Sequence, residues 1–214
     1  FYKSIEGEER ALFKVDGGVK LSYLAKFVAR YGLAGIENLV GVPGSVGGSV
    51  AMNAGAEGSE ISQVLRSIKF LTLNGEIKTY SKSEMIFAYR KTMFPSKDGI
   101  VIEAELDLSI GKISEIYLKM DKYLSRRGLT QPLNMPNSGS IFKNPDGEKA
   151  GHLIESAGLK GCQIGGAGVS IKHANFIVNK GGALAEDIIL LIKHIQTVVE
   201  EKSGIKLEQE IIVI

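Results

Sequence analysis

Apolar residues recur at helical spacing in three parts of the chain. The first is residues 21–29, where Ser22 is the expected N-cap. The second is residues 113–124, which follow an i, i+3, i+4, i+7 pattern, and the third is residues 184–198, which end before Gly204. The pattern therefore predicts three amphipathic helices.

Between these helices, short segments alternate in polarity or are apolar throughout, as strands are. Asn74 and Gly75 give the strongest hairpin signal, because both tolerate the positive φ angles of a two-residue turn. Residues 131–145, with three prolines, are expected to form a loop or an edge strand. Strands are predicted at residues 10–15, 64–73, 76–80, 100–108 and 206–214. The mixture of helices and strands indicates an α+β fold. Near Gly111 the pattern changes from strands to a long amphipathic helix, which predicts two domains, residues 1–111 and 112–214.

Composition limits the classes of function. With 214 residues, 44% of them hydrophobic, the chain is long enough to bury a core. A net charge of +2 with interspersed signs is unlike a nucleic-acid-binding surface, and no apolar run reaches the roughly 18 residues of a membrane span. The single Cys162 and the lack of a signal-peptide pattern favour the cytoplasm. We therefore expect no nucleic-acid or membrane partner and, without a coiled-coil seam or an apolar patch, a monomer.

Residues 41–58, called the glycine segment below, are the most unusual part of the chain. Six glycines and one proline in 18 positions weaken both helix and strand. Bare backbone approaches a ligand closely, and successive N–H groups form a concavity suited to a pyrophosphate. A dinucleotide is the expected ligand, although a glycine-rich loop taken alone is explained equally well as an irregular loop without a ligand.

Two further groups carry chemistry in the middle of the chain, each with a plainer explanation. Arg90, beside Tyr89 and other aromatic residues, is able to bind a carboxylate in bidentate fashion, or its stem covers apolar side chains. Residues 137–145 gather hydroxyls, an amine and an amide, which suits a polar ligand or a turn that enters a strand.

Two more groups follow towards the C-terminus. Glycines beside Lys160, Lys172 and His173 suit an anion site or a tight turn with solvated lysines. Strand alternation places Glu208 and Glu210 on one face, where a buried carboxyl stays protonated and acts as an acid, whereas an exposed one is an ordinary charge.

Taken in order along the chain, these groups resemble the UDP-N-acetylenolpyruvoylglucosamine reductases, a family of flavoenzymes. The resemblance implies part of an FAD-binding domain of the vanillyl-alcohol-oxidase type in residues 1–111, and a smaller α+β substrate-binding domain in residues 112–214. It implies no metal. The implied FAD contacts, with Ser45 at a phosphate, are Gly41, Val42, Pro43, Gly44, Ser45, Gly47, Gly48, Asn53, Gly55, Ala56 and Gly58.

The resemblance also implies a reaction of peptidoglycan precursor synthesis. NADPH is the implied reductant, and UDP-N-acetylglucosamine enolpyruvate is the implied substrate. Arg90 would bind the substrate carboxylate, a protonated Glu210 would hydrogen-bond to it, and Ser140 would protonate the adjacent carbon. Ser140 is chosen over Ser138 because the family's hydroxyl directly precedes an apolar–Phe pair. The other implied substrate contacts are Tyr89, Gln131, Lys143, Asn144, Lys160 and His173.

The chain departs from the family pattern at two points. The family's N-terminal subdomain has no counterpart before Phe1, so part of the flavin site is expected to be missing. His173 stands where some relatives have glutamine. The short stretch between Arg90 and Asp98 indicates the second of the family's two structural types. Two alternatives stay open, a UDP-sugar-binding fragment without catalysis and another FAD-dependent oxidoreductase.

Overall fold

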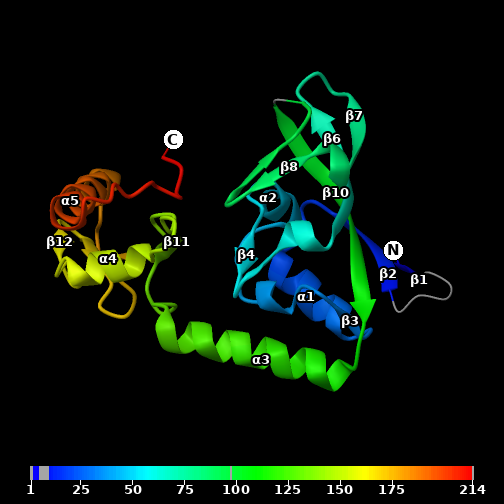
Figure 1. Cartoon of the computed structure of the whole chain (residues 1–214), viewed down its shortest axis with the longest axis horizontal. Helices are drawn as coiled ribbons and strands as arrows, with labels where there is room; N and C mark the ends of the chain where they lie inside the picture. The colour runs from blue at the N-terminus through cyan, green and yellow to red at the C-terminus, as the bar shows by residue number, and fades with distance from the viewer. Residues whose placement is uncertain (1, 5–9, 97, 214) are drawn as a thin grey trace. The chain divides into compact units, whose positions relative to one another are not determined.

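The structure is a computed structural model that describes residues 2–4, 10–96 and 98–213 (Figure 1). The chain divides into two compact units, Phe1–Ser125 and Arg126–Ile214. The division falls inside the long helix α3 (Ile113–Thr130), whereas the predicted domain boundary at residues 111 and 112 lies just before that helix. The two units are described separately below.

A six-stranded antiparallel sheet is the framework of the first unit. Its strands, in spatial order, are β1 (Tyr2–Ser4), β2 (Arg10–Asp16), β10 (Gly99–Ile110), β6 (Leu65–Thr72) and β7 (Ile77–Ser81), and β3 (Leu33–Ala34) also pairs with β10. The turn between β6 and β7 contains Gly75 at a φ of 82°, so the predicted hairpin is confirmed.

Shorter elements complete this unit, and Figure 1 shows α1 and α2 on the same side of β10. They are α1 (Leu21–Ala29), η1 (Glu37–Leu39), α2 (Val46–Ala51), β4 (Gly55–Ala56), β5 (Ser59–Glu60), η2 (Ile61–Gln63), η3 (Lys82–Glu84), β8 (Ile86–Ala88) and β9 (Lys91–Met93). The apolar stripe of α1 is buried as predicted. The predicted cap at Ser22 is wrong, because α1 is preceded by Lys20, and the Leu21 N–H donates to Gly44 O at 3.0 Å.

Helix α3 buries only part of its predicted apolar stripe in the core of the first unit, because Ile113, Tyr117 and Leu124 are exposed. Ile116 and Met120 are buried there among residues of the sheet and of α1. Leu118 and Leu129 are exposed on the same helix. No helix in residues 2–4, 10–96 and 98–213 is both long and apolar enough to span a bilayer.

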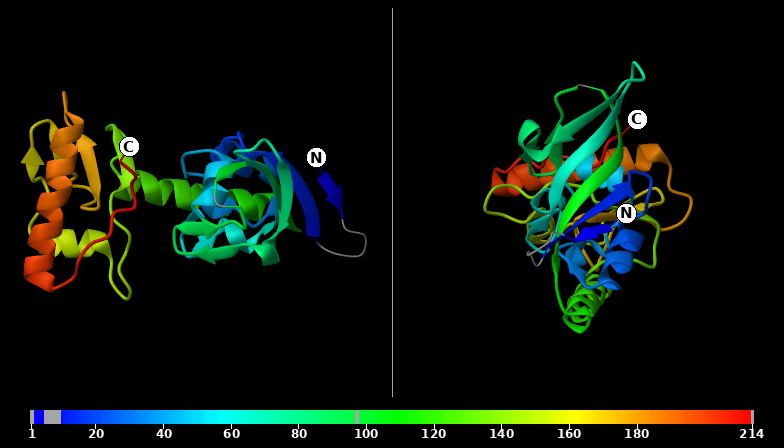
Figure 2. Two further views of the ribbon diagram at one scale, coloured as in Figure 1. Left: turned by 90° about the horizontal axis from the view of Figure 1, so that it is seen from above. Right: turned by 90° about the vertical axis from the view of Figure 1, so that its right-hand side faces the viewer.

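The second unit is a four-stranded antiparallel sheet with two helices (Figure 2). In spatial order its strands are β11 (Asn137–Ser140), β14 (Phe176–Asn179), β13 (Ala167–Val169) and β12 (Gln163–Ile164), and its helices are α4 (Ala150–Ser156) and α5 (Ala185–Ser203). Helix α5 packs on β12, β13 and α4, and ends at Gly204 with a φ of 72°, as its sequence predicts.

The strand predicted at residues 206–214 is not a full strand. Residues 205–213, called the C-terminal segment, pair through a single bridge, Gln209 with Phe142, and contain a bend at Ile211. Two flanking hydrogen bonds, Lys143 N–H to Glu208 O at 2.9 Å and Glu210 N–H to Ile141 O at 2.8 Å, complete this pairing. The ladder is short because its partner is the loop after β11 and not a long strand.

Candidate active site

The glycine segment is built around a short helix despite its composition. Helix α2 forms because Ser45 Oγ accepts from the Gly48 N–H at 3.2 Å as an N-cap. The first two N–H groups of α2 bond to the turn after β2. The Val46 N–H donates to Val19 O and the Gly47 N–H to Gly17 O, both at 2.8 Å. These contacts fix the start of α2 on the sheet.

The glycines of this segment divide into packed and open positions. Gly47 is buried, and a Cβ atom there would lie 2.6 Å from Val101 O. Gly44 and Gly48 are exposed. A Cβ atom at Gly44, whose φ is 107°, would meet nothing within 4 Å, and at Gly48 it would meet only Ser45 Oγ at 3.4 Å. Glycine therefore serves packing at Gly47 and leaves open backbone at Gly44 and Gly48.

The open positions fit the diphosphate of a dinucleotide. Among the residues that the structure describes, the N–H groups of Gly44 and Ser45 have no protein acceptor. Pro43 beside them is exposed and carries no donor. Unpaired backbone donors next to open space are the groups that bind phosphate oxygens.

Asn53, in the second half of the segment, is completely buried at a φ of 41°. Its Nδ2 donates to Glu60 Oε2 at 2.7 Å and to Ala88 O at 3.1 Å, and its Oδ1 accepts from the Ser62 N–H at 3.3 Å. The side chain thus bonds within the protein, although the resemblance implied a cofactor contact there.

The small hairpin β4–β5 follows Asn53. Gly55 pairs with Glu60, and a Cβ atom on Gly55 would lie 2.7 Å from Ser59 O. Ala56 O accepts from Asn38 Nδ2 at 2.8 Å. Gly58, at a φ of 82°, forms the exposed turn. The hairpin is therefore shaped by close backbone approach.

Arg90 lies in the turn of a second hairpin, β8–β9, called the arginine hairpin. Its φ is 57°, and Ala88 pairs with Lys91 on either side of the turn. The guanidinium Nη2 donates to Gly55 O at 3.1 Å, and Cζ lies 4.6 Å from the centre of the Tyr89 ring. Hydrogen bonding and ring contact together orient the guanidinium.

In the second unit, Ser140 closes strand β11. It is half-buried opposite Phe176, whereas Ser138 is exposed in the irregular part of the strand before Gly139, which has a φ of 82°. The Gly139 N–H donates to Asn137 Oδ1 at 2.9 Å. The two serines, which the sequence leaves as neighbours, therefore lie in different environments.

The residues after Ser140 are held by Asn175, which is 4% exposed. Asn175 Oδ1 accepts from the Phe142 N–H at 2.9 Å, and its Nδ2 donates to Phe142 O at 2.8 Å. Its backbone O also accepts from the Ile141 N–H at 2.9 Å. One buried amide thus satisfies both backbone groups of Phe142.

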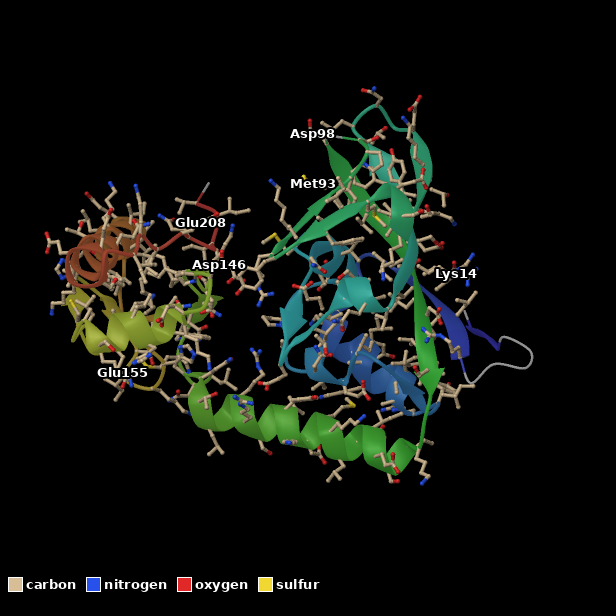
Figure 3. The ribbon with its side chains drawn as sticks, viewed as in Figure 1. Lys14, Met93, Asp98, Asp146, Glu155 and Glu208 are labelled. Atoms are coloured by element: carbon tan, nitrogen blue, oxygen red, sulfur yellow. The ribbon has the colours of Figure 1, made fainter. Side chains whose placement is uncertain are left out.

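The C-terminal segment lies along the other side of residues 141–143. Figure 3 labels Glu208 on it, and Glu208 bonds to Lys143 Nζ while remaining 72% exposed. Glu210 is half-buried, and its N–H bonds to Ile141 O. Leu207 anchors the segment at 1% exposure. The structure therefore places the backbone of Glu210 against Ile141, the residue after Ser140. Glu210 is also less exposed than Glu208.

Two predicted substrate contacts lie near the ends of helices. Asn144 Oδ1 accepts from the Ala150 N–H at 3.1 Å, at the start of α4. Gln131 follows α3, and within the described part of the chain its buried Oε1 has no hydrogen-bond donor. A buried acceptor without a donor favours a ligand or water contact.

Lys160 and His173 form a third group with Glu155, which Figure 3 labels in the second unit. Lys160 Nζ bonds to Glu155 Oε1 at 2.6 Å. His173 Nδ1 accepts from the Asn175 N–H at 3.3 Å, and its ring meets Phe176 edge-on at 4.8 Å between centres. Burial, reinforced by the charge of Lys160 and opposed by Glu155, lowers the pKa of His173 below its usual value.

Two residues that shape these sites were not predicted from the sequence. Thr92 Oγ1 donates to Val50 O at 2.6 Å from within β9, and nothing in its sequence context indicates this bond. Asn175 stands between Ala174 and Phe176, and an amide in an apolar run was a usable signal of a buried hydrogen bond.

Comparisons with known proteins match both units. Residues 3–81 match the sequence model of an FAD binding domain, and residues 131–214 match that of the UDP-N-acetylenolpyruvoylglucosamine reductase C-terminal domain. The reductase of Halalkalibacterium halodurans is 46% identical over 197 residues, covering 92% of this chain and 65% of that protein. The reductase of Listeria innocua is 45% identical over 212 residues, covering 99% and 71%.

A solved structure agrees with these sequences. The crystal structure of UDP-N-acetylenolpyruvylglucosamine reductase (MurB) from Thermus caldophilus superposes with a TM-score of 0.83 at 38% identity, covering 92% of this chain and 71% of that one. The protein thus has the α+β fold that the sequence predicted, in which a match to an FAD-binding domain precedes a match to the reductase C-terminal domain. The chain belongs to the UDP-N-acetylenolpyruvoylglucosamine reductase family and spans 65 to 71% of the length of the two relatives described.

Proposed function

We propose that this chain reduces UDP-N-acetylglucosamine enolpyruvate to UDP-N-acetylmuramate, with FAD as hydride carrier and NADPH as reductant. Residues 1–111 would hold the flavin and residues 112–214 the substrate. The observation that carries the proposal is that, in a member of this family, Glu210 is bonded to the residue directly after Ser140. We include a cytoplasmic, monomeric enzyme in the proposal, with no membrane or nucleic-acid partner.

The open part of the glycine segment supports the assignment of the flavin. The N–H groups of Gly44 and Ser45 would bind phosphate oxygens, and the exposed Gly48 would allow close approach. Buried Gly47 and Asn53 would shape this surface without offering their side-chain positions to the ligand. The flavin, when bound, supplies a hydride to the vinyl carbon remote from the substrate carboxylate.

Three side chains would then complete the reduction. Arg90 binds the substrate carboxylate, and Glu210 in its acid form hydrogen-bonds to it, so both contacts strengthen as enolate charge develops. Ser140 delivers its hydroxyl proton to the adjacent carbon. Hydride and proton together saturate the carbon–carbon double bond.

The polar groups of the second unit would bind the nucleotide end of the substrate. Lys160 offers a cation for the pyrophosphate, and His173 beside it offers Nε2–H because Nδ1 accepts a backbone hydrogen bond. Lys143 and Asn144 follow Ser140 and would contact the sugar or phosphates. Gln131 would present its free oxygen to a donor on the ligand. From the first unit, Tyr89 would contact substrate beside Arg90.

An anaerobic visible spectrum tests the proposal. FAD is added first, then NADPH, then the enolpyruvyl sugar. Flavin that NADPH bleaches and the sugar restores is the expected result. Absence of flavin uptake contradicts the proposal and leaves UDP-sugar binding to be measured. Flavin that NADPH bleaches but the sugar does not restore indicates another FAD-dependent oxidoreductase.

Ser140→Ala separates the two half-reactions. We expect unchanged flavin reduction and a loss of about 10²- to 10⁴-fold in the rate of reoxidation by the enolpyruvyl sugar, because only the second half-reaction needs the proton. Ser138→Ala is the matched control and should leave both rates unchanged. Equal slowing of both half-reactions by Ser140→Ala would remove Ser140 from its assigned role.

A further inference from the structure

Three of the hydrogen bonds that the structure describes join the arginine hairpin to the glycine segment. Asn53 Nδ2 donates to Ala88 O at 3.1 Å. Arg90 Nη2 donates to Gly55 O at 3.1 Å, and Thr92 Oγ1 donates to Val50 O at 2.6 Å. One bond lies before the turn, one at the turn and one after it, so both strands of the hairpin are attached.

The bond from Thr92 to Val50 is buried, whereas the bond from Asn53 is only partly buried, because its acceptor Ala88 is exposed. Thr92 itself is 8% exposed, so water does not readily replace its bond when it breaks. Strands β8 and β9 have three residues each, and a hairpin of that size does not hold its own position in water. Phe87 and Phe94 pack against the core of the unit. They attach the strand β8 and the residue that follows β9, while the hydrogen bonds hold the turn to the glycine segment.

We propose that Thr92 is a positioning residue that, together with Asn53, fixes the guanidinium of Arg90 relative to the glycine segment. The inference rests on the proposed function, in which the glycine segment holds the flavin and Arg90 holds the substrate carboxylate. Since the distance between hydride donor and acceptor carbon must be kept within a fraction of an ångström, bonds that join these two segments govern the rate.

Two substitutions at Thr92 separate the hydroxyl from the packing. Thr92→Val keeps the shape and removes the donor, whereas Thr92→Ser keeps the donor and removes a methyl group. Val50 O keeps its bond from the Asn53 N–H at 3.1 Å in both variants, so the carbonyl is not left unpaired. Both variants are therefore expected to fold.

Amide hydrogen exchange without added flavin is the first measurement. In Thr92→Val, amides of residues 86–93 should exchange about fivefold faster, the factor that corresponds to one ordinary hydrogen bond. Amides of β6 and of the second unit should keep their rates, and Thr92→Ser should match the wild type. Unchanged exchange in the hairpin, or an increase spread over the whole first unit, would overturn the proposal.

Half-reactions with the loaded chain are the second measurement. Thr92→Val should leave flavin reduction by NADPH unchanged and slow reoxidation by the enolpyruvyl sugar about fivefold, with recovery in Thr92→Ser. Faster exchange with unchanged reoxidation would overturn the positioning of Arg90. A wild-type chain that takes up flavin but is not reoxidised defeats the proposed function instead, and hairpin exchange then decides alone whether Thr92 fixes the hairpin.

Discussion

Helix α2 in the glycine segment of the first unit and residues 141–144 of the second, called the Ser140 loop, are held in place by different means. In the glycine segment, side chains are absent where the backbone must pass closely, as at Gly47 beside Val101 O. In the Ser140 loop, one buried side chain, Asn175, replaces a missing strand partner by bonding both backbone groups of Phe142.

The difference shows two ways to make a rigid irregular backbone. Close packing of bare backbone leaves N–H groups of neighbouring residues open to a ligand, which suits a diphosphate. An amide that satisfies the backbone keeps the loop in shape while the side chains of Ser140, Lys143 and Asn144 remain available. Substitutions should therefore damage the first region by adding atoms and the second by removing them.

The largest effect is expected from Gly47→Ala. The new Cβ atom would lie 2.6 Å from Val101 O and 3.3 Å from Gly17 O, so α2 must move off the sheet. We expect a loss of about 3 kcal/mol in the free energy of unfolding, measured with urea.

Gly48→Ala is the matched control on the same helix. Its Cβ atom would meet only Ser45 Oγ at 3.4 Å, so stability should stay the same or rise by up to about 1 kcal/mol through helix propensity. Because Gly48 is exposed in the assigned flavin site, flavin affinity should fall. Equal destabilisation by the two substitutions would contradict the division into packed and open glycines.

Asn175→Ala tests whether the buried amide holds the Ser140 loop. It removes two hydrogen bonds and leaves the buried N–H and C=O of Phe142 unpaired. We expect a loss of about 2 kcal/mol, confined to the second unit, by urea unfolding with amide exchange as the local readout. A loss below about 0.5 kcal/mol would show that water replaces the amide.

His173 gives the second unit a stability that depends on pH. Its pKa is lowered from 6.5 by burial first and by Lys160 second. As the pH falls below 6.5, the unfolded chain binds a proton that the folded chain does not, so stability present above 6.5 decreases until the lower folded pKa is reached. His173→Gln should flatten this part of the stability profile.

An NMR titration of His173 tests the cause of that shift. Lys160→Met should raise its pKa, because the lysine charge disfavours imidazolium. Lys172→Met is the control, since the Lys172 amine bonds to Gly128 O instead. A pKa that does not move in Lys160→Met would leave burial as the whole cause.

The smallest effect is expected from Glu208→Gln. The carboxylate bonds to Lys143 but is 72% exposed, so solvent screens the pair. We expect Glu208→Gln to change the free energy of unfolding by less than about 0.5 kcal/mol, at low salt and at high salt alike. A larger loss would mean that the ion pair, and not the backbone bonds and Leu207, holds the C-terminal segment.

The sequence by itself determined the elements that depend on local pattern. The presence of α1, α3 and α5, the turn at Gly75 and the end at Gly204 follow from periodicity and from glycine's tolerance of positive φ. The ordered motifs were also sufficient to predict the family, because separate short matches in one order are far more specific than any one of them.

Only the tertiary structure decided which polar groups form hydrogen bonds inside the protein and which remain open to a ligand. Asn53 and Gly48 look equivalent as members of one glycine-rich segment, yet one is buried with three bonds and the other is open. Glu208 and Glu210 share a predicted face but differ in exposure, because the C-terminal segment pairs through one bridge instead of a strand. The physical reason is that burial and hydrogen bonding depend on partners distant in sequence, and local patterns do not specify those partners.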